Sequence, residues 1–320
     1  MGYEEYRGRT RTTVTSAAGW ILGIALLGGL LALGAARAAG EPAPSGDTEE
    51  AAQQAGDRVI LVTGSTSGLG REVALRLAEE GAHIIVHGRN EERGREVVRQ
   101  IEEETPGSAA FYRADLASNA EINELADRIL EDYDRLDVLL NNAGIYLNPE
   151  GRVLSQDGYE LRFHVNYLSH FLLTERLLPL LRESAPSRIV NVASGAQTPI
   201  DFDDVMLEEG YSESRAYAQS KLAQVLHTFE LEERLEGTGI TVNTLHPATL
   251  MDTPMVEEAG TQPRSTVDEG AEAVLQLVND DVGSGRYFNG LNPTRAHDQA
   301  YDEEARDRLW ELSEELTGLD

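Results

Sequence analysis

Cysteine is absent from the 320-residue chain. This absence excludes disulfide bonds, thiolate zinc sites, iron–sulfur clusters, a cysteine nucleophile and a lipidated cysteine anchor. Basic residues are scarce, because 27 lysines and arginines stand against 56 aspartates and glutamates, and the formal net charge is −29. Nucleic acids and anionic lipid surfaces are bound through basic patches. The composition therefore argues against a nucleic-acid partner and against peripheral docking on anionic lipid.

Lysine is the scarcest charged residue and occurs once, at Lys221; the other 26 basic residues are arginine. An acid-rich, lysine-poor surface stays soluble by self-repulsion, which high salt would screen. A salt-adapted host and a GC-rich genome that encodes arginine in place of lysine both explain this pattern, and the sequence does not choose between them. The hydrophobic share of 41% still suffices for an ordinary core.

Charged residues are also missing from residues 17–36, AAGWILGIALLGGLLALGAA. About 20 apolar residues are what a helix needs to cross roughly 30 Å of hydrocarbon. A retained anchor and a cleaved signal peptide remain alternatives, and the length of the run favours the anchor. We expect a polar tail (1–16), this hydrophobic helix (17–36), a flexible acidic linker (37–56) and one folded domain (57–320).

Apolar runs of strand length alternate with helical periodicity through the folded domain. Strands are expected at 58–64, 83–88, 109–115, 137–144, 188–194, 240–247 and 285–289. Helices are expected at Leu69–Glu80, Glu91–Glu104, Asn119–Asp132 and Glu213–Glu236, and in a long stretch that ends at Leu181. Repeated βαβ units with nearly all-apolar strands predict one doubly wound α/β domain of Rossmann type, with a mostly parallel, seven-stranded sheet covered by helices on both faces.

The first expected strand runs into a glycine-rich turn. Its residues are Thr63, Gly64, Ser65, Thr66, Ser67, Gly68, Leu69 and Gly70. Glycines permit a tight turn and let a pyrophosphate approach the backbone, and the next helix offers free N–H groups at its positive dipole end. Glycines also occur in ordinary turns, but this place in a βαβ series favours a dinucleotide site.

Three motifs in this order and spacing, TGSTSGLG, NNAG and YAQSK, resemble those of the classical short-chain dehydrogenases/reductases. The longer phrases RIVNVAS and YAQSKLAQVLHTFELEERLEGTGITVNTLHP are similar to the retinol dehydrogenase-like subgroup. The resemblance covers residues 57–320. It implies an oxidoreductase that interconverts an alcohol and a carbonyl compound, lipophilic in that subgroup, by hydride transfer with a nicotinamide cofactor.

The cofactor preference is read at the end of the second expected strand. An NAD site places a carboxylate there for the ribose 2′-hydroxyl, but this chain has Gly88 followed by Arg89. A guanidinium can grip a 2′-phosphate, although Arg89 could also be a solvated arginine at a helix start. We therefore expect NADP(H). The resemblance extends the cofactor site to Asn90, Asp115, Leu116, Asn142, Ala143, Gly144, Pro247 and Thr249, besides residues 64–70 of the glycine turn, Tyr217 and Lys221.

Tyr217 and Lys221 lie four residues apart, on one face of the expected helix. An unperturbed tyrosine has a pKa of about 10, and a lysine cation one turn away is expected to lower it. The only lysine of the chain stands where arginine, with its larger planar head, could not replace a compact ammonium. We therefore expect Tyr217 to act as the general acid/base, supported by Lys221.

The resemblance assigns two further residues to the chemistry. Ser194 would hold the substrate oxygen, and Asn166 would orient a water that relays protons to the lysine. A polar residue hydrogen-bonded in the core is the lesser alternative for Asn166. The alternative to an enzyme is a catalytically idle NADP(H)-binding sensor or scaffold on the same fold, which has no need to keep all four residues. The seven histidines show no metal-ligand spacing, so no metal is expected.

Location and assembly are the least constrained features. Arg7, Arg9 and Arg11 before the hydrophobic segment, against Arg37 after it, favour the folded domain outside the cell. The supply of reduced cofactor favours the cytoplasm, which we weakly prefer. The partners expected are a small-molecule substrate and the membrane through residues 17–36, with a homo-oligomer left open.

Overall fold

The computed structural model describes residues 58–146 and 151–319. The expected tail, hydrophobic helix and linker (1–56) lie outside the described residues. Within these two described ranges, no helix is both long enough and apolar enough to cross a membrane.

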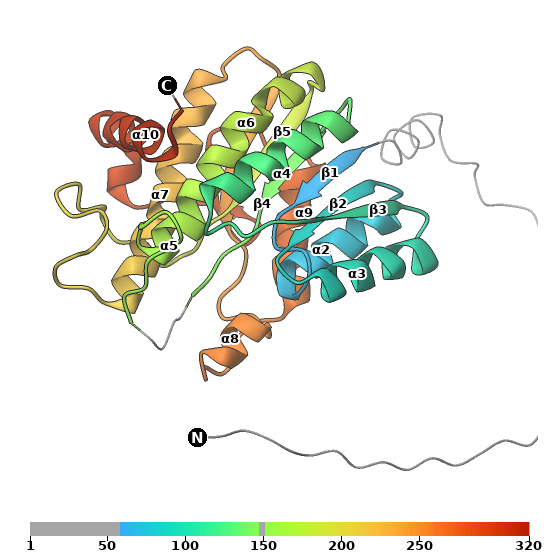
Figure 1. Ribbon diagram of the computed structural model, residues 1–320, viewed down its shortest axis with the longest axis horizontal. Helices are drawn as coiled ribbons and strands as arrows, with labels where there is room; N and C mark the ends of the chain where they lie inside the picture. The colour runs from blue at the N-terminus through green and yellow to red at the C-terminus, as the bar shows by residue number, and fades with distance from the viewer. Residues whose placement is uncertain (1–57, 147–150, 320) are drawn as a thin grey trace, which may run out of the picture. The chain divides into compact units, whose positions relative to one another are not determined.

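An eight-stranded sheet forms the centre of the folded domain, in the order β3-β2-β1-β4-β5-β6-β7-β8 (Figure 1). The strands are β1 (Val59–Val62), β2 (His83–Gly88), β3 (Ser108–Arg113), β4 (Val138–Asn141), β5 (Ser187–Val192), β6 (Ile240–His246), β7 (Arg286–Asn289) and β8 (Asn292–Pro293). All neighbours pair in parallel except β7 and β8, which are antiparallel. The expected count of seven strands is wrong by this two-residue strand, which is too short to show a period.

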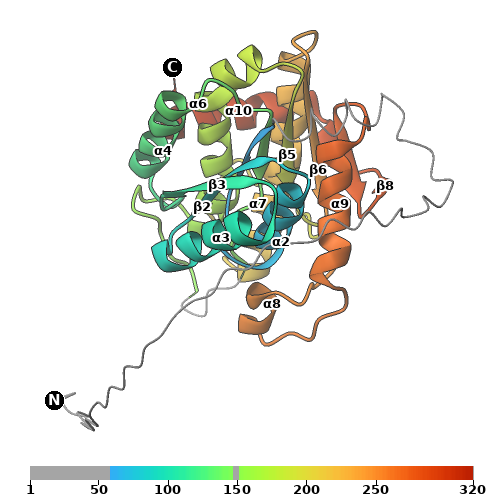
Figure 2. The same ribbon diagram turned by 90° about the vertical axis from the view of Figure 1, so that its right-hand side faces the viewer.

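Helices cover both faces of the sheet (Figures 1 and 2). The α-helices are α2 (Gly68–Glu79), α3 (Glu91–Glu104), α4 (Asn119–Asp132), α5 (Leu161–Phe163), α6 (Ser169–Glu183), α7 (Glu213–Arg234), α8 (Pro254–Glu258), α9 (Val267–Asn279) and α10 (Glu303–Thr317). A π-helix, η1 (His164–Leu168), joins α5 to α6, and a 3-10 helix, η2 (Asp298–Tyr301), precedes α10. Two hydrophobic cores result. One packs α2, α3 and α9 on the sheet, and the other packs α4, α6, α7 and α10.

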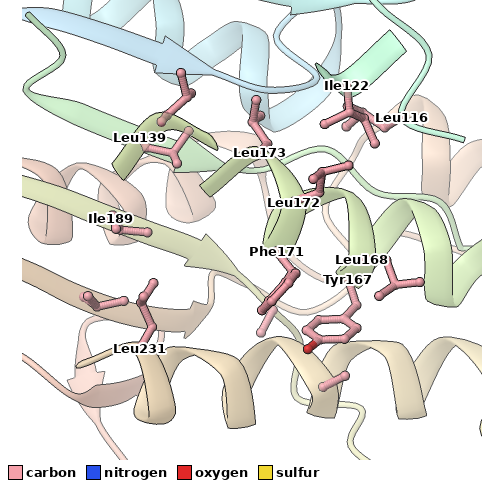
Figure 3. Packing of buried hydrophobic residues seen from close by; sticks show 14 of the residues in the cluster. Leu116, Ile122, Leu139, Tyr167, Leu168, Phe171, Leu172, Leu173, Ile189 and Leu231 are labelled. Carbon is pink, nitrogen blue, oxygen red and sulfur yellow. The ribbon is translucent and has the colours of Figure 1, made fainter. Parts of the chain in front are cut away.

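The two cores explain the continuous apolar strands. In β1, Leu61 points into the core with α6 and α7, whereas its neighbours Ile60 and Val62 point into the core with α2 and α9. Side chains alternate along a strand, so a sheet covered on both faces needs apolar residues at every position. Figure 3 shows Leu139 of β4 and Ile189 of β5 among the side chains that fill the α6–α7 side.

Two helices that follow strands begin at a capping side chain. Asn90 accepts a hydrogen bond from the Arg93 amide, and Ser118 accepts one from the Glu121 amide. Such N-caps fix where a helix begins, and α3 and α4 have the predicted bounds. The long stretch expected to end at Leu181 is instead interrupted by the π-turn of η1 and ends at Glu183. The sequence analysis did not predict α8, α9, α10 or η2.

Candidate active site

A cavity of about 660 Å³ lies at the carboxyl end of the parallel strands. Doubly wound sheets place ligands at this edge, because the loops after the strands diverge there. The predicted site residues that line it are Gly64, Thr66, Ser67, Gly68, Leu69, Gly70, Arg89, Asp115, Leu116, Asn142, Ala143, Gly144, Ser194, Tyr217, Lys221, Pro247 and Thr249. Segments from seven separate parts of the sequence therefore converge on one space.

Three predicted site residues do not line the cavity. Ser65 lies beneath the glycine turn, where its Oγ donates to the Val62 carbonyl (2.8 Å) and accepts from the His87 amide (3.0 Å). Asn90 caps α3. Asn166 is fully buried behind the cavity wall. All three support the site from outside it.

The glycine turn packs directly on the segment after β4. Gly64 adopts a φ of +67°, which favours glycine. A Cβ on Gly70 would lie 2.5 Å from the Gly64 carbonyl oxygen and would overlap the Asn142 side chain. Asn142 in turn donates its Nδ2 to the Thr63 carbonyl at 2.8 Å. The two walls thus approach more closely than any side chain at position 70 would allow.

The first turn of α2 faces the cavity and suits an anion. Ser67 stands at the N-cap, but its side chain makes no cap bond to the described residues, and the first turn carries no acidic residue. The leading N–H groups and the positive dipole end are thus left for a ligand. Arg89, exposed at the end of β2, adds a fixed positive charge to the same wall.

Tyr217, Ser194 and Lys221 meet at the other end of the cavity. Lys221 is only 4% exposed, and its Nζ donates to the Val192 carbonyl and to Gln224 Oε1, both at 2.8 Å. Burial lowers the pKa of Lys221 to about 7. The Nζ atom lies 5.9 Å from the centre of the Tyr217 ring.

The pKa of Tyr217 differs from the expectation. Burial raises it, a hydrogen bond with Ser194 lowers it, and the neighbouring Tyr146 raises it again. The expected depression by Lys221 is therefore wrong for this arrangement, because desolvation outweighs the favourable contacts. Tyr217 keeps its proton at neutral pH and is poised to donate it.

Asn166 clamps the segment after β4 to α7. Its Oδ1 accepts from the Ile145 amide (2.8 Å), and its Nδ2 donates to the Ile145 carbonyl and to Ser220 Oγ, both at 3.0 Å. The residue lies in the π-helix η1, and π-turns are often found at functional sites. All of its side-chain bonds are used within the protein, which fits the core interpretation as well as the catalytic one.

The sequence analysis missed several residues around the reacting end. The Tyr146 ring lies edge-on to that of Tyr217, with ring centres 4.7 Å apart. Gln224 and His170 stand behind Lys221. Gln224 lies three residues after Lys221 on α7, a helical spacing that the sequence shows, whereas the contacts of Tyr146 and His170 join segments far apart in the chain.

Comparisons with known proteins agree with this geometry. The model of the short chain dehydrogenase family matches residues 58–264. Retinol dehydrogenase 14 of Mus musculus is 37% identical, covering 92% of this chain and 96% of its own length. Retinol dehydrogenase 13 of Homo sapiens is 39% identical, covering 82% and 85%.

Solved structures show the same fold. A crystal structure of an uncharacterized protein from Mycobacterium paratuberculosis has a TM-score of 0.70 and 31% identity, covering 82% of this chain and 94% of its own. A short chain dehydrogenase from Shigella flexneri 2a str. 301, complexed with NADP, has a TM-score of 0.61 and 31% identity, covering 74% and 98%.

Replacing Gly70 with alanine tests the close approach of the two walls. Helix propensity alone predicts that Gly→Ala stabilises a helix by about 0.5–1 kcal/mol. The backbone contact at Gly70 predicts the opposite sign, a loss of about 1–3 kcal/mol in the free energy of unfolding, measured by urea denaturation. Gly270→Ala in α9 is the matched control, because its Cβ would meet the flexible end of Met251. A gain in stability at both positions would contradict the packing described.

Proposed function

The chain belongs to the short-chain dehydrogenase family, and we propose that it is an NADP(H)-dependent oxidoreductase that interconverts an alcohol and a carbonyl compound. The observation that carries the proposal is the meeting of Ser194, Tyr217 and Lys221 in the same cavity as the free first turn of α2. An anion site and a proton donor at opposite ends of one cavity are what a phosphate-bearing redox cofactor and its substrate require.

The residues present fit a nicotinamide dinucleotide. The glycine turn and the first turn of α2 would hold the pyrophosphate, and Asp115 and Leu116 would flank the adenine. Gly144 leaves open the space beside the reacting end, where an added Cβ would lie 3.5 Å from Lys221 Nζ and 3.3 Å from Asn166 Oδ1. When bound, the cofactor would supply or accept the hydride.

The chain's own residues would move the proton. In carbonyl reduction, Tyr217 donates its hydroxyl proton to the substrate oxygen, which Ser194 also holds by a hydrogen bond. The raised pKa of Tyr217 keeps that proton available at neutral pH. The phenolate left behind is stabilised by the Ser194 hydroxyl and by the Lys221 ammonium. In alcohol oxidation the same groups act in reverse, so Tyr217 must first lose its proton.

An apolar substrate is the third part of the proposal. Ile145, Leu250, Met251, Met255 and Val256 line the cavity. Methionine side chains adapt to apolar ligands of varied shape, and the matched relatives are named retinol dehydrogenases. We therefore infer lipophilic aldehydes or ketones and the corresponding alcohols.

Substitution of Tyr217 and Lys221 tests the chemistry. Tyr217→Phe removes the proton donor, and Lys221→Arg keeps the charge but not the compact ammonium. We expect each to lower the rate of NADPH oxidation, measured with a panel of lipophilic aldehydes and ketones, by about a hundredfold or more. Both should still bind NADPH. Near-normal turnover in either variant would contradict the assigned role, and a wild type that binds NADPH but reduces no carbonyl would favour the idle module.

Arg89→Ala tests the cofactor preference. Loss of the guanidinium is expected to weaken NADPH binding at least about tenfold, because a charged hydrogen bond to the 2′-phosphate is lost, while NADH binding changes little. Fluorescence titration of both cofactors measures this. Arg93→Ala is the control, since Arg93 is also exposed, three residues into α3, but does not line the cavity. An equal loss for both cofactors would remove the basis for NADP(H).

We also propose that residues 17–36 anchor the protein in a membrane, with the acidic linker (37–56) between this anchor and the folded domain (57–320). The proposal rests on the uncharged run and on its length. Cell fractionation should place the full-length chain with membranes, and protease added to spheroplasts should spare a cytoplasmic domain. Full-length protein in the soluble fraction would refute the anchor, and digestion from outside would refute the cytoplasmic side.

A further inference from the structure

The catalytic lysine is held from behind by a chain of buried polar side chains. Gln224 Oε1 accepts from Lys221 Nζ at 2.8 Å, and Gln224 Nε2 lies 2.8 Å from His170 Nδ1. Gln224 and His170 are each 1% exposed. The mechanism proposed above assigns no role to Gln224 or His170. Gln224 nevertheless bonds Lys221, the cation on which that mechanism depends.

The chemistry of the three side chains fixes which atom donates in each hydrogen bond between Lys221, Gln224 and His170. An ammonium can only donate, so the Gln224 oxygen must face Lys221 and the Gln224 amide nitrogen must face His170. His170 Nδ1 must then accept, which requires a neutral imidazole with its proton on Nε2. Burial, together with the charge of Lys221, holds the pKa of His170 well below its ordinary value, so the imidazole is neutral. A protonated His170 would turn the Gln224 oxygen away from Lys221.

The Gln224–His170 hydrogen bond is one of two equivalent contacts between the same two helical segments. Asn166 bonds Ser220, and four residues further along each segment His170 bonds Gln224. Residues four apart share one face of a helix, so Lys221 lies between these contacts. Asn166 also bonds the Ile145 backbone and thus joins α7 to the cavity wall formed by residues 142–145.

We propose that Gln224, oriented by neutral His170, is a positioning residue that holds Lys221 Nζ in place and stabilises its charged form. The proposal rests on the proposed function, in which the Lys221 ammonium stabilises the Tyr217 phenolate. Two oxygens at 2.8 Å favour the ammonium and so oppose the burial that lowers the pKa of Lys221. The other titratable groups around Lys221 are Tyr217 on its own helix, His170 on α6 and His246 at the end of β6.

The chain offers an unusually direct measurement, because Lys221 is its only lysine. Full-length protein produced with [ε-13C]lysine carries a single labelled side chain, and its resonance titrates with the charge of Nζ. Gln224→Leu removes the acceptor and should lower the titration midpoint by about one unit or more. Gln224→Glu places a carboxylate beside Nζ and should raise it. A purely structural role predicts no such opposite shifts.

Substitutions of His170 test its part in the chain. His170→Leu removes the acceptor for Gln224 and should lower the Lys221 midpoint as Gln224→Leu does. His170→Asn places an acceptor oxygen close to the position of the lost Nδ1 and should return the midpoint to the wild-type value. His227→Leu is the matched control, because His227 is also buried in the same core, with Phe171 and Trp310 as neighbours, and should leave the midpoint unchanged. Circular dichroism verifies that each variant is folded.

The pH dependence of carbonyl reduction links the measurement to function. The rate should fall as pH rises through the Lys221 midpoint, at lower pH in Gln224→Leu and at higher pH in Gln224→Glu. Lys221 midpoints that stay unchanged, or that move in the same direction in both variants, would overturn the proposal. A pH–rate profile that does not follow the shifted midpoints would overturn it as well. The lysine titration needs no turnover, so a wild type without carbonyl reductase activity would refute the proposed function while the titration still decides how Lys221 is held.

Discussion

One buried ammonium ion is the constraint around which this site is organised. A buried cation loses its hydration, and it stays charged only where oxygen atoms replace the water. Lys221 obtains these oxygens from the end of β5 and from its own helix α7. Both elements must therefore keep a fixed distance, and the contacts of Asn166 and His170 between α7 and the adjoining helix serve that requirement.

The same constraint explains why the site combines rigid and open parts. Behind Lys221, buried hydrogen bonds link α7 to β5 and to α6. In front of it, the wall is made by glycine, alanine and the ends of strands, which leave room for a ligand. A proton donor with a raised pKa, Tyr217, stands at the boundary between the two. Hydride and proton transfer to the same substrate require precise placement of the catalytic groups on one side and free volume for the ligand on the other.

Much of the fold could be predicted because apolar runs of strand length and helical periodicity are both local features of the sequence. Apolar runs marked the seven parallel strands, and helical periodicity marked the helices that alternate with them. The two-residue strand β8 is too short to show an alternating pattern of apolar residues. Helices α9 and α10 lie in regions where only strand signals were considered. Within the site, motifs located Tyr217, Ser194 and the glycine turn, but Tyr146 and His170 depend on contacts between distant segments. The raised pKa of Tyr217 could not be predicted either, since desolvation depends on packing rather than on spacing.

The burial of the only lysine also determines how the protein's surface meets its proposed substrates. Aldehydes condense with free amines to form imines, and lysine side chains are the usual targets of such damage. Arginine supplies all other side-chain positive charge here, and its guanidinium stays protonated and is a poor nucleophile. Under the proposed function, the folded domain therefore offers its carbonyl substrates no exposed lysine with which to form an imine.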